Sequence, residues 1–337
     1  MRDYSFFFWP FDRKNVGWDA IGMKCWLFCG FVILWVVGCA VPPVGPTHVS
    51  AVGVDVRTDL TIIEPTTDNR INWSDVLLQI RDADVVLLGE QHDHAVGHAV
   101  QLAIVEDVMD TYPGSVLALE MLERDEQILV DDFMEDFIDA ETLEKLSFST
   151  NWGGRGGWVA WYQPIIEATK DRGGEVVAAN APRRYVRLAR TGGYERIDEL
   201  ADIRRQHIDY PEELSGGRYR QRFWELAAHS GAEDKENVEE VDVTVLDPDD
   251  PMLPVFRSQQ AWDATMAQSI VNAEPNKLKK VVLLVGQFHV EYDGGVVQEL
   301  RQRNPSLNVF VISIQREIPD EEWMGKPVIA DIMVVDN

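Results

Sequence analysis

Short runs of apolar residues alternate along most of the chain with longer segments that have helical periodicity. The runs are rich in Val, Leu and Ile and lack the polar alternation of a half-exposed sheet, which predicts strands buried on both faces. These runs are Ala83–Glu90, Ser115–Met121, Glu175–Pro182, Lys279–Gln287 and Leu307–Ile314. The helical segments between them include His98–Tyr112, Val159–Gly173 and Ser258–Glu274. This order predicts an α/β fold with a mostly parallel central sheet flanked by helices.

Two intervals interrupt this alternation. Residues 125–157 and 204–273 have helical or irregular patterns, and we expect them to form an inserted helical subdomain on the carboxyl side of the strands. Within the second interval, Gly231–Pro251 is acidic and has no helical periodicity, which predicts an exposed loop. We expect the whole α/β body to occupy residues 61–337.

The first 38 residues are typical of a secretory signal rather than of the fold. An apolar stretch from Cys25 to Val37 follows Lys24 and is shorter than the roughly 20 apolar residues that a membrane-spanning helix needs. Because Met23 would also serve as the start of a signal, we expect Met1–Gly22 to be an upstream extension that is not translated. An uncleaved membrane anchor is the alternative.

The signal segment ends in VVGCA, which resembles the bacterial lipobox, where small residues precede a lipidated cysteine. This resemblance implies that Cys39 is the lipid anchor, followed up to residue 60 by a Pro-rich tether. All three cysteines lie at or before this point, at Cys25, Cys29 and Cys39. The mature body is therefore expected to have no disulfide, no thiolate metal site and no cysteine nucleophile.

The chain is strongly acidic. Its 57 Asp and Glu outnumber its 31 Lys and Arg, which gives a formal net charge of −26. A surface of this sign repels nucleic acid and anionic lipid headgroups, so neither is an expected partner. The charge itself is explained by solubility or by a saline environment.

Polar residues follow four of the predicted strands at the point where each strand ends. The first strand is followed by Glu90 and His92, the second contains Glu120, the third precedes Arg183, and the fourth is followed by His289. Because ligands bind at the carboxyl ends of parallel strands, we expect these side chains to share one rim of the sheet. Two of them lie in Gly-x-x-His motifs, GEQH and GQFH. Histidine and carboxylate there are suited to binding a divalent transition metal or to acid–base chemistry.

Other histidines near the first motif have less specific roles. Asp93 is placed to cap the following helix, and His94 is expected to be an exposed residue at the helix start. His98 lies four residues later on the same face, and the sequence leaves its role open. His207 and His229 belong to the helical intervals and are expected to be solvated.

The segment from Asn151 to Trp158 reads NWGGRGGW, so two tryptophans flank a glycine-rich turn. One interpretation is a mobile lid or wall for a planar ligand. The other is a subdomain junction packed by indole rings. Tyr162 has a similar ambiguity, because it is either a core residue or a phenolate directed at iron.

The motifs together resemble the ChaN-like haem-binding lipoproteins, a family within the superfamily of Tiki-type proteases and erythromycin esterase-like hydrolases. The segments that carry the resemblance lie between about Ala83 and Ile314 and include LLGEQHDHAVGHAVQLAI, LALEML, WYQPIIEATKDRGGEVVAANAPR, QQAWDATMAQSI and LLVGQFHVEYDGG. The acidic segment Gly231–Pro251 departs from what we associate with the family.

The resemblance implies an α/β domain that carries a helical subdomain, haem as the cofactor and a homodimer linked to haem capture. It also implies that a tyrosine holds the haem iron. Tyr162 is the first choice because it lies in a matched motif, followed by Tyr185, Tyr219 and Tyr292, and His98 is a further candidate near the cofactor. The implied location is the bacterial envelope, with the chain anchored to the outer membrane and facing the periplasm or the surface.

Three functions remain open at this point. The first is a haem-binding lipoprotein that takes part in haem or iron acquisition. The second is a metal-dependent hydrolase in which Glu90, His92, Glu120 and His289 hold the ion and Arg183 stabilises an oxyanion. The third is a non-catalytic scaffold whose rim residues are idle.

Overall fold

The computed structural model describes residues 53–231, 245–319 and 327–336. Its centre is an eight-stranded sheet with the order β2-β1-β8-β7-β3-β6-β4-β5. The strands are β1 (Thr61–Glu64), β2 (Asn69–Ile71), β3 (Val85–Glu90), β4 (Val116–Glu123), β5 (Glu175–Asn180), β6 (Val281–Gly286), β7 (Val309–Gln315) and β8 (Ile332–Val335). The strands from β8 to β5 are parallel, and β1 pairs antiparallel with β8 and β2 at the edge.

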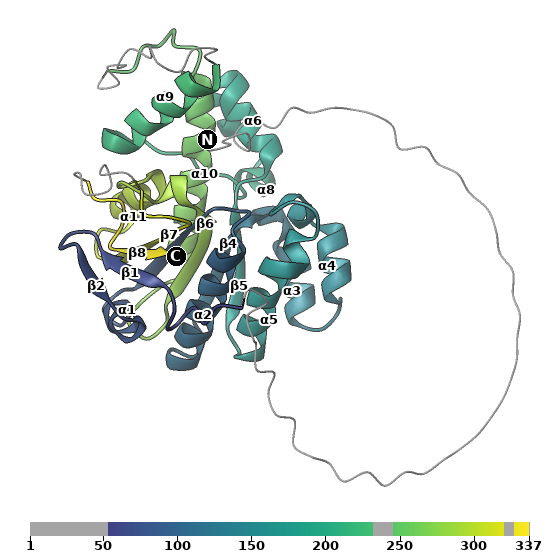
Figure 1. Ribbon diagram of the computed structural model, residues 1–337. Coiled ribbons are helices and arrows are strands. Elements are labelled where there is room, and N and C mark those ends of the chain that lie inside the picture. Colours follow the sequence, from purple (N-terminus) through teal and green to yellow (C-terminus); the bar gives the residue numbers. More distant parts are fainter. Residues whose placement is uncertain (1–52, 232–244, 320–326, 337) are drawn as a thin grey trace, which may run out of the picture. The chain divides into compact units, whose positions relative to one another are not determined.

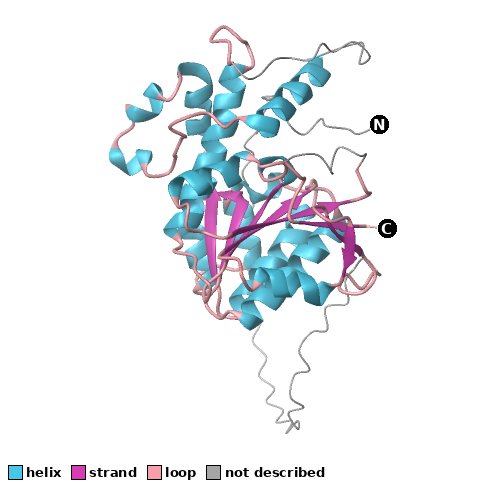
Figure 2. Ribbon diagram, turned by 90° about the vertical axis from the view of Figure 1, so that its left-hand side faces the viewer, coloured by secondary structure: helices cyan, strands magenta, loops and turns pink. Residues whose placement is uncertain are grey.

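Helices cover both faces of this sheet, as Figures 1 and 2 show. The helices of the first half of the chain are α1 (Trp73–Ile80), α2 (Ala95–Thr111), α3 (Gln127–Met134), α4 (Ala140–Leu146) and α5 (Gln163–Asp171). The later helices are α6 (Arg183–Gly192), α7 (Glu195–Asp198), α8 (Asp202–Arg205), α9 (Gly217–Gly231), α10 (Leu253–Asn272) and α11 (Gly295–Arg303). Short helical turns are η2 (Arg124–Glu126), η3 (Phe148–Asn151), η4 (Trp158–Tyr162) and η5 (Gln287–His289).

The predicted α/β class is confirmed, and the five predicted strands correspond to β3, β4, β5, β6 and β7. The sequence pattern did not indicate β1, β2 and β8, which are only three or four residues long. Both intervals expected to be helical contain helices where they are described. The second interval ends in α10, however, which packs on the sheet itself, so it includes a layer of the α/β body.

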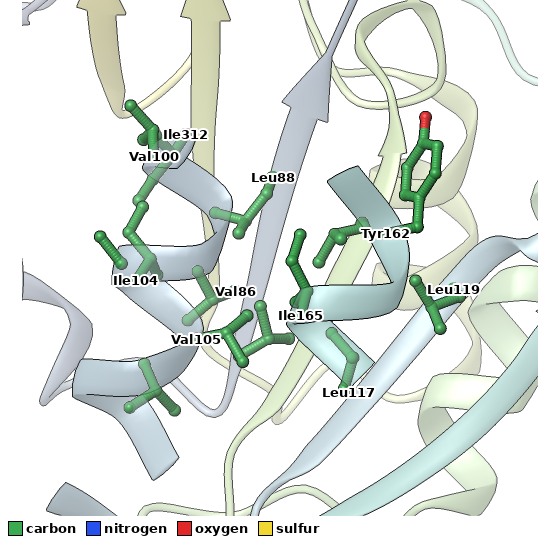
Figure 3. Packing of buried hydrophobic residues seen from close by; sticks show 14 of the residues in the cluster. Val86, Leu88, Val100, Ile104, Val105, Leu117, Leu119, Tyr162, Ile165 and Ile312 are labelled. Atoms are coloured by element: carbon green, nitrogen blue, oxygen red, sulfur yellow. The ribbon is translucent and has the colours of Figure 1, made fainter. Parts of the chain in front are cut away.

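The apolar runs of the central strands supply two separate cores. Val86 and Leu88 of β3 face a cluster that includes Val100 and Ile104 of α2 (Figure 3). Their neighbours Val85 and Leu87 face the opposite cluster, which includes residues of α10 and α11. Successive side chains of a strand point to opposite faces, so a strand covered on both sides must be apolar at every position. This explains the uninterrupted runs of Val, Leu and Ile.

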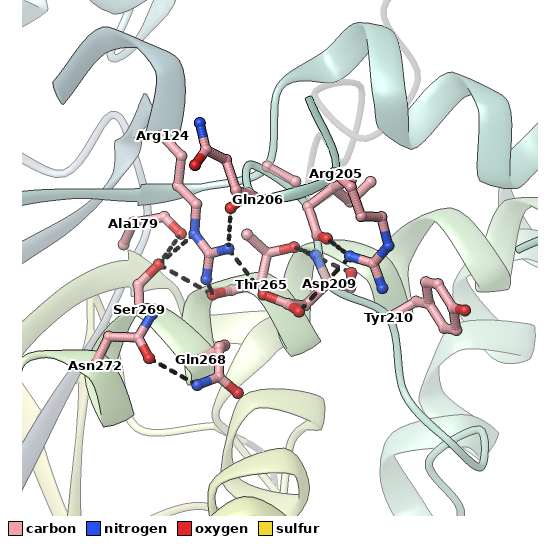
Figure 4. Close-up of polar contacts among 12 residues, drawn as sticks. Arg124, Ala179, Arg205, Gln206, Asp209, Tyr210, Thr265, Gln268, Ser269 and Asn272 are labelled. Carbon is pink, nitrogen blue, oxygen red and sulfur yellow. Dashed lines mark hydrogen bonds and ion pairs between the residues drawn. The ribbon is translucent and has the colours of Figure 1, made fainter. Parts of the chain in front are cut away.

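Arg124 connects the end of β4 to the later helices (Figure 4). Its guanidinium donates to Asp209 Oδ2 at 2.8 Å and to the Thr265 carbonyl oxygen at 2.7 Å. It also donates to Ser269 Oγ at 2.9 Å and to the Gln206 carbonyl oxygen at 3.2 Å. The arginine side chain is only 11% exposed, so these acceptors would be left largely without a donor if it were removed.

We therefore expect Arg124→Ala to lower the free energy of unfolding by about 3 kcal/mol, because breaking a buried ion pair leaves the other partner uncompensated. Urea unfolding followed by circular dichroism measures this value. The matched control is Arg196→Ala, because Arg196 pairs with Glu199 at the surface with both side chains more than half exposed. The control should change stability by less than about 1 kcal/mol. Equal effects of the two substitutions would contradict the role of Arg124.

Candidate functional site

The carboxyl ends of β3, β4 and β6 bring buried polar side chains to one rim of the sheet. Glu90 is the last residue of β3 and pairs in register with Gly286, the last residue of β6. Glu120 lies in β4 where the pairing with β5 becomes irregular, between Leu119 and Glu123. Such an irregularity redirects a side chain at the end of a strand. Oε2 of Glu120 accepts the amide of Gly286 at 2.6 Å, which ties β4 to the end of β6.

Glu90 and His92 form the first hydrogen-bonded pair of this rim. Nδ1 of His92 lies 2.7 Å from Oε1 of Glu90. The same oxygen accepts the hydroxyl of Tyr162 at 2.6 Å, and Oε2 accepts Nε2 of Gln101 at 2.5 Å. Glu90 is buried, whereas the side chain of His92 is 29% exposed. The carboxylate thus fixes the imidazole from inside and leaves Nε2 directed away from it.

The charges of this pair shift both pKa values. Burial would raise the pKa of Glu90, but the neighbouring His98 and His92 and the Tyr162 hydroxyl lower it below its ordinary value. Burial would lower the pKa of His92, but the hydrogen bond and charge of Glu90 and the charge of Glu120 raise it above its ordinary value. The glutamate is therefore ionised at neutral pH, and the histidine is a stronger base than a free imidazole.

His289 lies between two buried carboxylates and forms the second group of the rim. Its Nδ1 is 2.5 Å from Oδ1 of Asp263, and its Nε2 is 3.4 Å from Oε1 of Glu120. Asp263 also accepts the hydroxyl of Tyr219 at 2.5 Å and Nε2 of Gln260 at 3.1 Å through Oδ2. Burial would lower the pKa of His289, but Glu120 and Asp263 raise it to about 10. Burial would likewise raise the pKa of Glu120, but mainly the charge of His289 lowers it to about 2.

The two groups meet at Gly286. A Cβ atom on this glycine would lie 3.2 Å from Nε2 of His92 and 3.5 Å from Oε2 of Glu120. A side chain at this position would crowd the imidazole of His92. His92, Glu120 and His289 therefore lie at the same end of the sheet, as expected from the sequence. Arg183 stands further out, where it is 43% exposed and donates to Oε1 of Glu123 at 3.2 Å.

The four proposed metal ligands are arranged as two pairs, Glu90 hydrogen-bonded to His92 and Glu120 in an ion pair with His289. Across residues 53–231, 245–319 and 327–336, no group of three or more His, Cys, Asp or Glu side chains has the arrangement of a metal site. The oxygens of Glu90 instead accept three hydrogen bonds within the protein. Binding of a metal by these residues stays a prediction.

The glycine-rich segment after Asn151 packs over His92. The rings of Trp152 and His92 are 4.8 Å apart, and the guanidinium of Arg183 lies 5.4 Å from the Trp152 ring centre. Gly153, Gly154 and Gly156 all have positive φ angles, which glycine adopts at no steric cost. Trp158 is buried and donates through Nε1 to Oε1 of Gln163 at 3.0 Å. The first tryptophan thus covers the rim, and the second packs in the core.

Tyr162 and His98, the cofactor residues named from the sequence, lie behind the rim rather than at the surface. η4 is a π-helical turn, and its last residue, Tyr162, is completely buried with its hydroxyl bound to Glu90. Burial and the charge of Glu90 hold the pKa of Tyr162 well above its usual value, which disfavours a phenolate. Nδ1 of His98 lies 2.9 Å from Oε1 of Gln101, and Nε2 lies 3.2 Å from the carbonyl oxygen of His92. The other candidate tyrosines, Tyr185, Tyr219 and Tyr292, are also buried.

Two sequence predictions near the first motif are wrong. The N-cap residue of α2 is His94 rather than Asp93, and the carboxylate of Asp93 instead accepts Arg316 at 2.6 Å. His94 is not exposed, because its side chain is buried with Nε2 3.2 Å from Oδ2 of Asp336. Both errors have the same physical cause: the chain that follows β7 and β8 packs against the start of α2, which a local pattern does not reveal.

The sequence reasoning missed Asp263 and Gln101, which complete the two groups of the rim, and it named Tyr219 only as a candidate haem ligand. Asp263 belongs to α10, in which six of the thirteen buried residues are polar, and Gln259 and Gln260 lie on the preceding turn. Polar residues three or four positions apart on an otherwise buried helix were the available signal. Cys39 and most of the acidic segment Gly231–Pro251 lie outside the described residues. None of the helices in the described ranges is long and apolar enough to cross a membrane.

Comparison with known proteins gives a family and a shared fold. The sequence matches the family described as "Haem-binding uptake, Tiki superfamily, ChaN" over residues 76–300. Among solved structures, ChaN of Campylobacter jejuni, described with cofacial haem binding, is similar with 21% sequence identity and a TM-score of 0.60. That likeness covers 82% of this chain and 96% of the other, and it shows a common fold.

A second solved structure, an erythromycin esterase mutant in its open conformation, is similar with 14% identity and a TM-score of 0.40, over 82% of each chain. The search of proteins with curated functions found no match. The family match, in contrast, spans more than half of the chain and includes both Gly-x-x-His motifs. The protein therefore belongs to the ChaN family of haem-binding uptake proteins in the Tiki superfamily.

Proposed function

We propose that this protein binds haem in the bacterial cell envelope and takes part in haem or iron acquisition. The observation that carries the proposal is the match to the haem-binding family over residues 76–300. The similar protein from Campylobacter jejuni is described as binding haem cofacially. By analogy, a homodimer is the proposed state in which this chain captures haem. Haem supplies an iron centre that accepts axial ligands and a planar macrocycle with two carboxylates.

We also propose a lipid anchor on Cys39, with the body held at the outer membrane and facing the periplasm or the surface. The signal-like segment and the lipobox-like VVGCA support this location. A lipid anchor followed by a Pro-rich tether would keep an acidic body near the membrane while its own charge keeps it off an anionic lipid surface.

The residues present fit haem only in part. Guanidinium groups suit its carboxylates, and exposed arginines are available on α6. Tyr162 and His98 do not offer a free donor atom, because the hydroxyl of Tyr162 and both ring nitrogens of His98 already have partners inside the protein. Iron could bind either residue only after these contacts broke.

Hemin added to the body from Ser50 onward is expected to shift its Soret band and to saturate at micromolar concentration. Tyr162→Phe should leave this spectrum unchanged, because the phenol is buried and its proton is held by Glu90. Absorbance titration measures both outcomes. A wild-type spectrum that does not change would contradict haem binding. Loss of the band in Tyr162→Phe with an intact fold would instead make Tyr162 the iron ligand.

A second candidate function is hydrolysis at the rim, and the geometry of His92 favours it. Glu90 binds Nδ1, which leaves Nε2 as the atom that would accept a proton. Nε2 of His92 and Oε2 of Glu120 both lie beside Gly286, which brings a proton acceptor and a carboxylate together at the carboxyl ends of the strands. His289, with a pKa of about 10, is an imidazolium at neutral pH and would stabilise negative charge rather than act as a base.

A metal-dependent form of this hydrolase would use Glu90, His92, Glu120 and His289 as ligands. It predicts about one equivalent of Zn²⁺, Mn²⁺ or Co²⁺ per chain after reconstitution, and loss of that metal in His92→Ala. Elemental analysis by mass spectrometry measures the content. If the reconstituted wild type contains only trace metal, the metal-dependent hydrolase is excluded. Acid–base hydrolysis without a metal and an idle scaffold then remain as explanations of the rim.

The charges of the rim predict a pH dependence of stability. The pKa of His289 is raised to about 10, so its contribution is complete below its ordinary value of 6.5 and is lost as the pH rises through about 10. The contribution of Glu120, with a pKa of about 2, is complete above 4.5 and is lost as the pH falls through about 2. We therefore expect wild-type stability to fall between pH 7 and pH 10.

His289→Gln should remove most of this alkaline loss, which is on the order of 3 kcal/mol for a buried charged group. Urea unfolding at a series of pH values measures it. His207→Gln is the control, because His207 is partly exposed and its pKa lies below 6.5. An alkaline slope of the same size in wild type and His289→Gln would show that His289 is not the charged group.

A further inference from the structure

Helix α6 carries a row of exposed arginines. Arg183, Arg187 and Arg190 are four and three residues apart, so they lie on the same face of the helix, and all three are exposed. With a rise of 1.5 Å per residue, the row is about 10 Å long. The opposite face, formed by Tyr185, Val186 and Ala189, is buried against the rest of the protein.

Two of these arginines have no carboxylate partner among the residues that the structure describes. Arg183 binds Glu123, but no ion pair joins Arg187 or Arg190 to any residue in the described ranges. Other exposed arginines of the chain do have such partners; Arg57 pairs with Asp107, and Arg316 pairs with Asp93. Arg187 and Arg190 therefore present two guanidinium groups on one helix face that are not neutralised by an ion pair with a described residue.

The surrounding segment is basic within an acidic chain. Residues 183–205 contain seven arginines and four acidic residues, a local balance of 7 − 4 = +3, whereas the whole chain carries −26. A negatively charged ligand is repelled by most of the surface and attracted here. The position also fits a ligand near the rim, because α6 starts three residues after the end of β5 and Arg183 lies against Trp152.

The chemistry of the row selects a ligand with carboxylate groups. The planar guanidinium forms two parallel hydrogen bonds with one carboxylate, so neighbouring arginines suit a molecule that carries two of them. We propose that Arg187 and Arg190 of α6 bind the two propionate carboxylates of haem. This inference rests on the proposed haem-binding function and gives that function a location on the molecule.

Hemin and its dimethyl ester provide the test, because the ester keeps the iron and the ring but lacks the two negative charges. Wild type and the double variant Arg187→Gln/Arg190→Gln are titrated with each compound and followed by Soret absorbance. We expect the double variant to bind hemin at least tenfold more weakly than wild type. We expect both proteins to bind the ester with the same affinity, because the ester has no carboxylate groups for the arginines to bind.

The matched control is Arg204→Gln, because Arg204 on α8 is also exposed and has no ion pair with a described residue. This control should bind hemin like wild type, which separates the row on α6 from a general loss of positive charge. Arg187→Lys/Arg190→Lys should recover only part of the affinity, because lysine provides the charge without the paired hydrogen bonds. Circular dichroism establishes that each variant is folded.

The outcomes distinguish this inference from the function on which it rests. If wild type binds neither hemin nor the ester, haem binding and the inference both fail. If wild type binds hemin and the double variant binds it equally well, haem binding stands and the inference is wrong. Vesicles of phosphatidylcholine with phosphatidylglycerol add a further arm. Loss of vesicle binding in the double variant, with unchanged hemin affinity, would show that the row contacts anionic lipid instead.

Discussion

The hydrogen bond from the amide of Gly286 to the carboxylate of Glu120 joins the ends of two parallel strands, and the organisation of the rim depends on it. A buried carboxylate is costly unless donors and opposite charges surround it. Here the imidazolium of His289 supplies the main opposite charge, and the amide of Gly286 supplies a donor. Ionised carboxylates can therefore be buried at the carboxyl ends of these strands at neutral pH. An apolar core alone would not permit this.

The cost of burying a charge separates the polar residues of this protein into buried, paired residues of the rim and exposed arginines of α6. Glu90, Asp263 and His289 are buried, and their hydrogen-bonding atoms are occupied by neighbours. Such a network is rigid and holds fixed charges, which suits electrostatic stabilisation or proton transfer at a single point. The proposed place for haem is different, because the arginine row of α6 is exposed and lies beside the rim.

This separation reconciles the two functions that the residues suggest. Haem bound at the arginines and a small substrate bound at the rim would not compete for the same atoms, because the arginines lie on the exposed face of α6 while Nε2 of His92 lies beside Gly286. Trp152 lies between the two regions, in contact with both His92 and Arg183.

The sequence by itself determined the α/β class, the central strands and the gathering of Glu90, His92, Glu120 and His289 at one rim. Apolar strands alternating with helices can form only a sheet covered on both faces, and parallel strands end on the same side. Tertiary structure alone decided the partners of these residues. Asp263 reaches His289 from α10, the helix before β6, and Nε2 of the buried His94 contacts Asp336 near the end of the chain. Local patterns fix where a side chain leaves its strand, but a contact between distant segments depends on how whole elements pack.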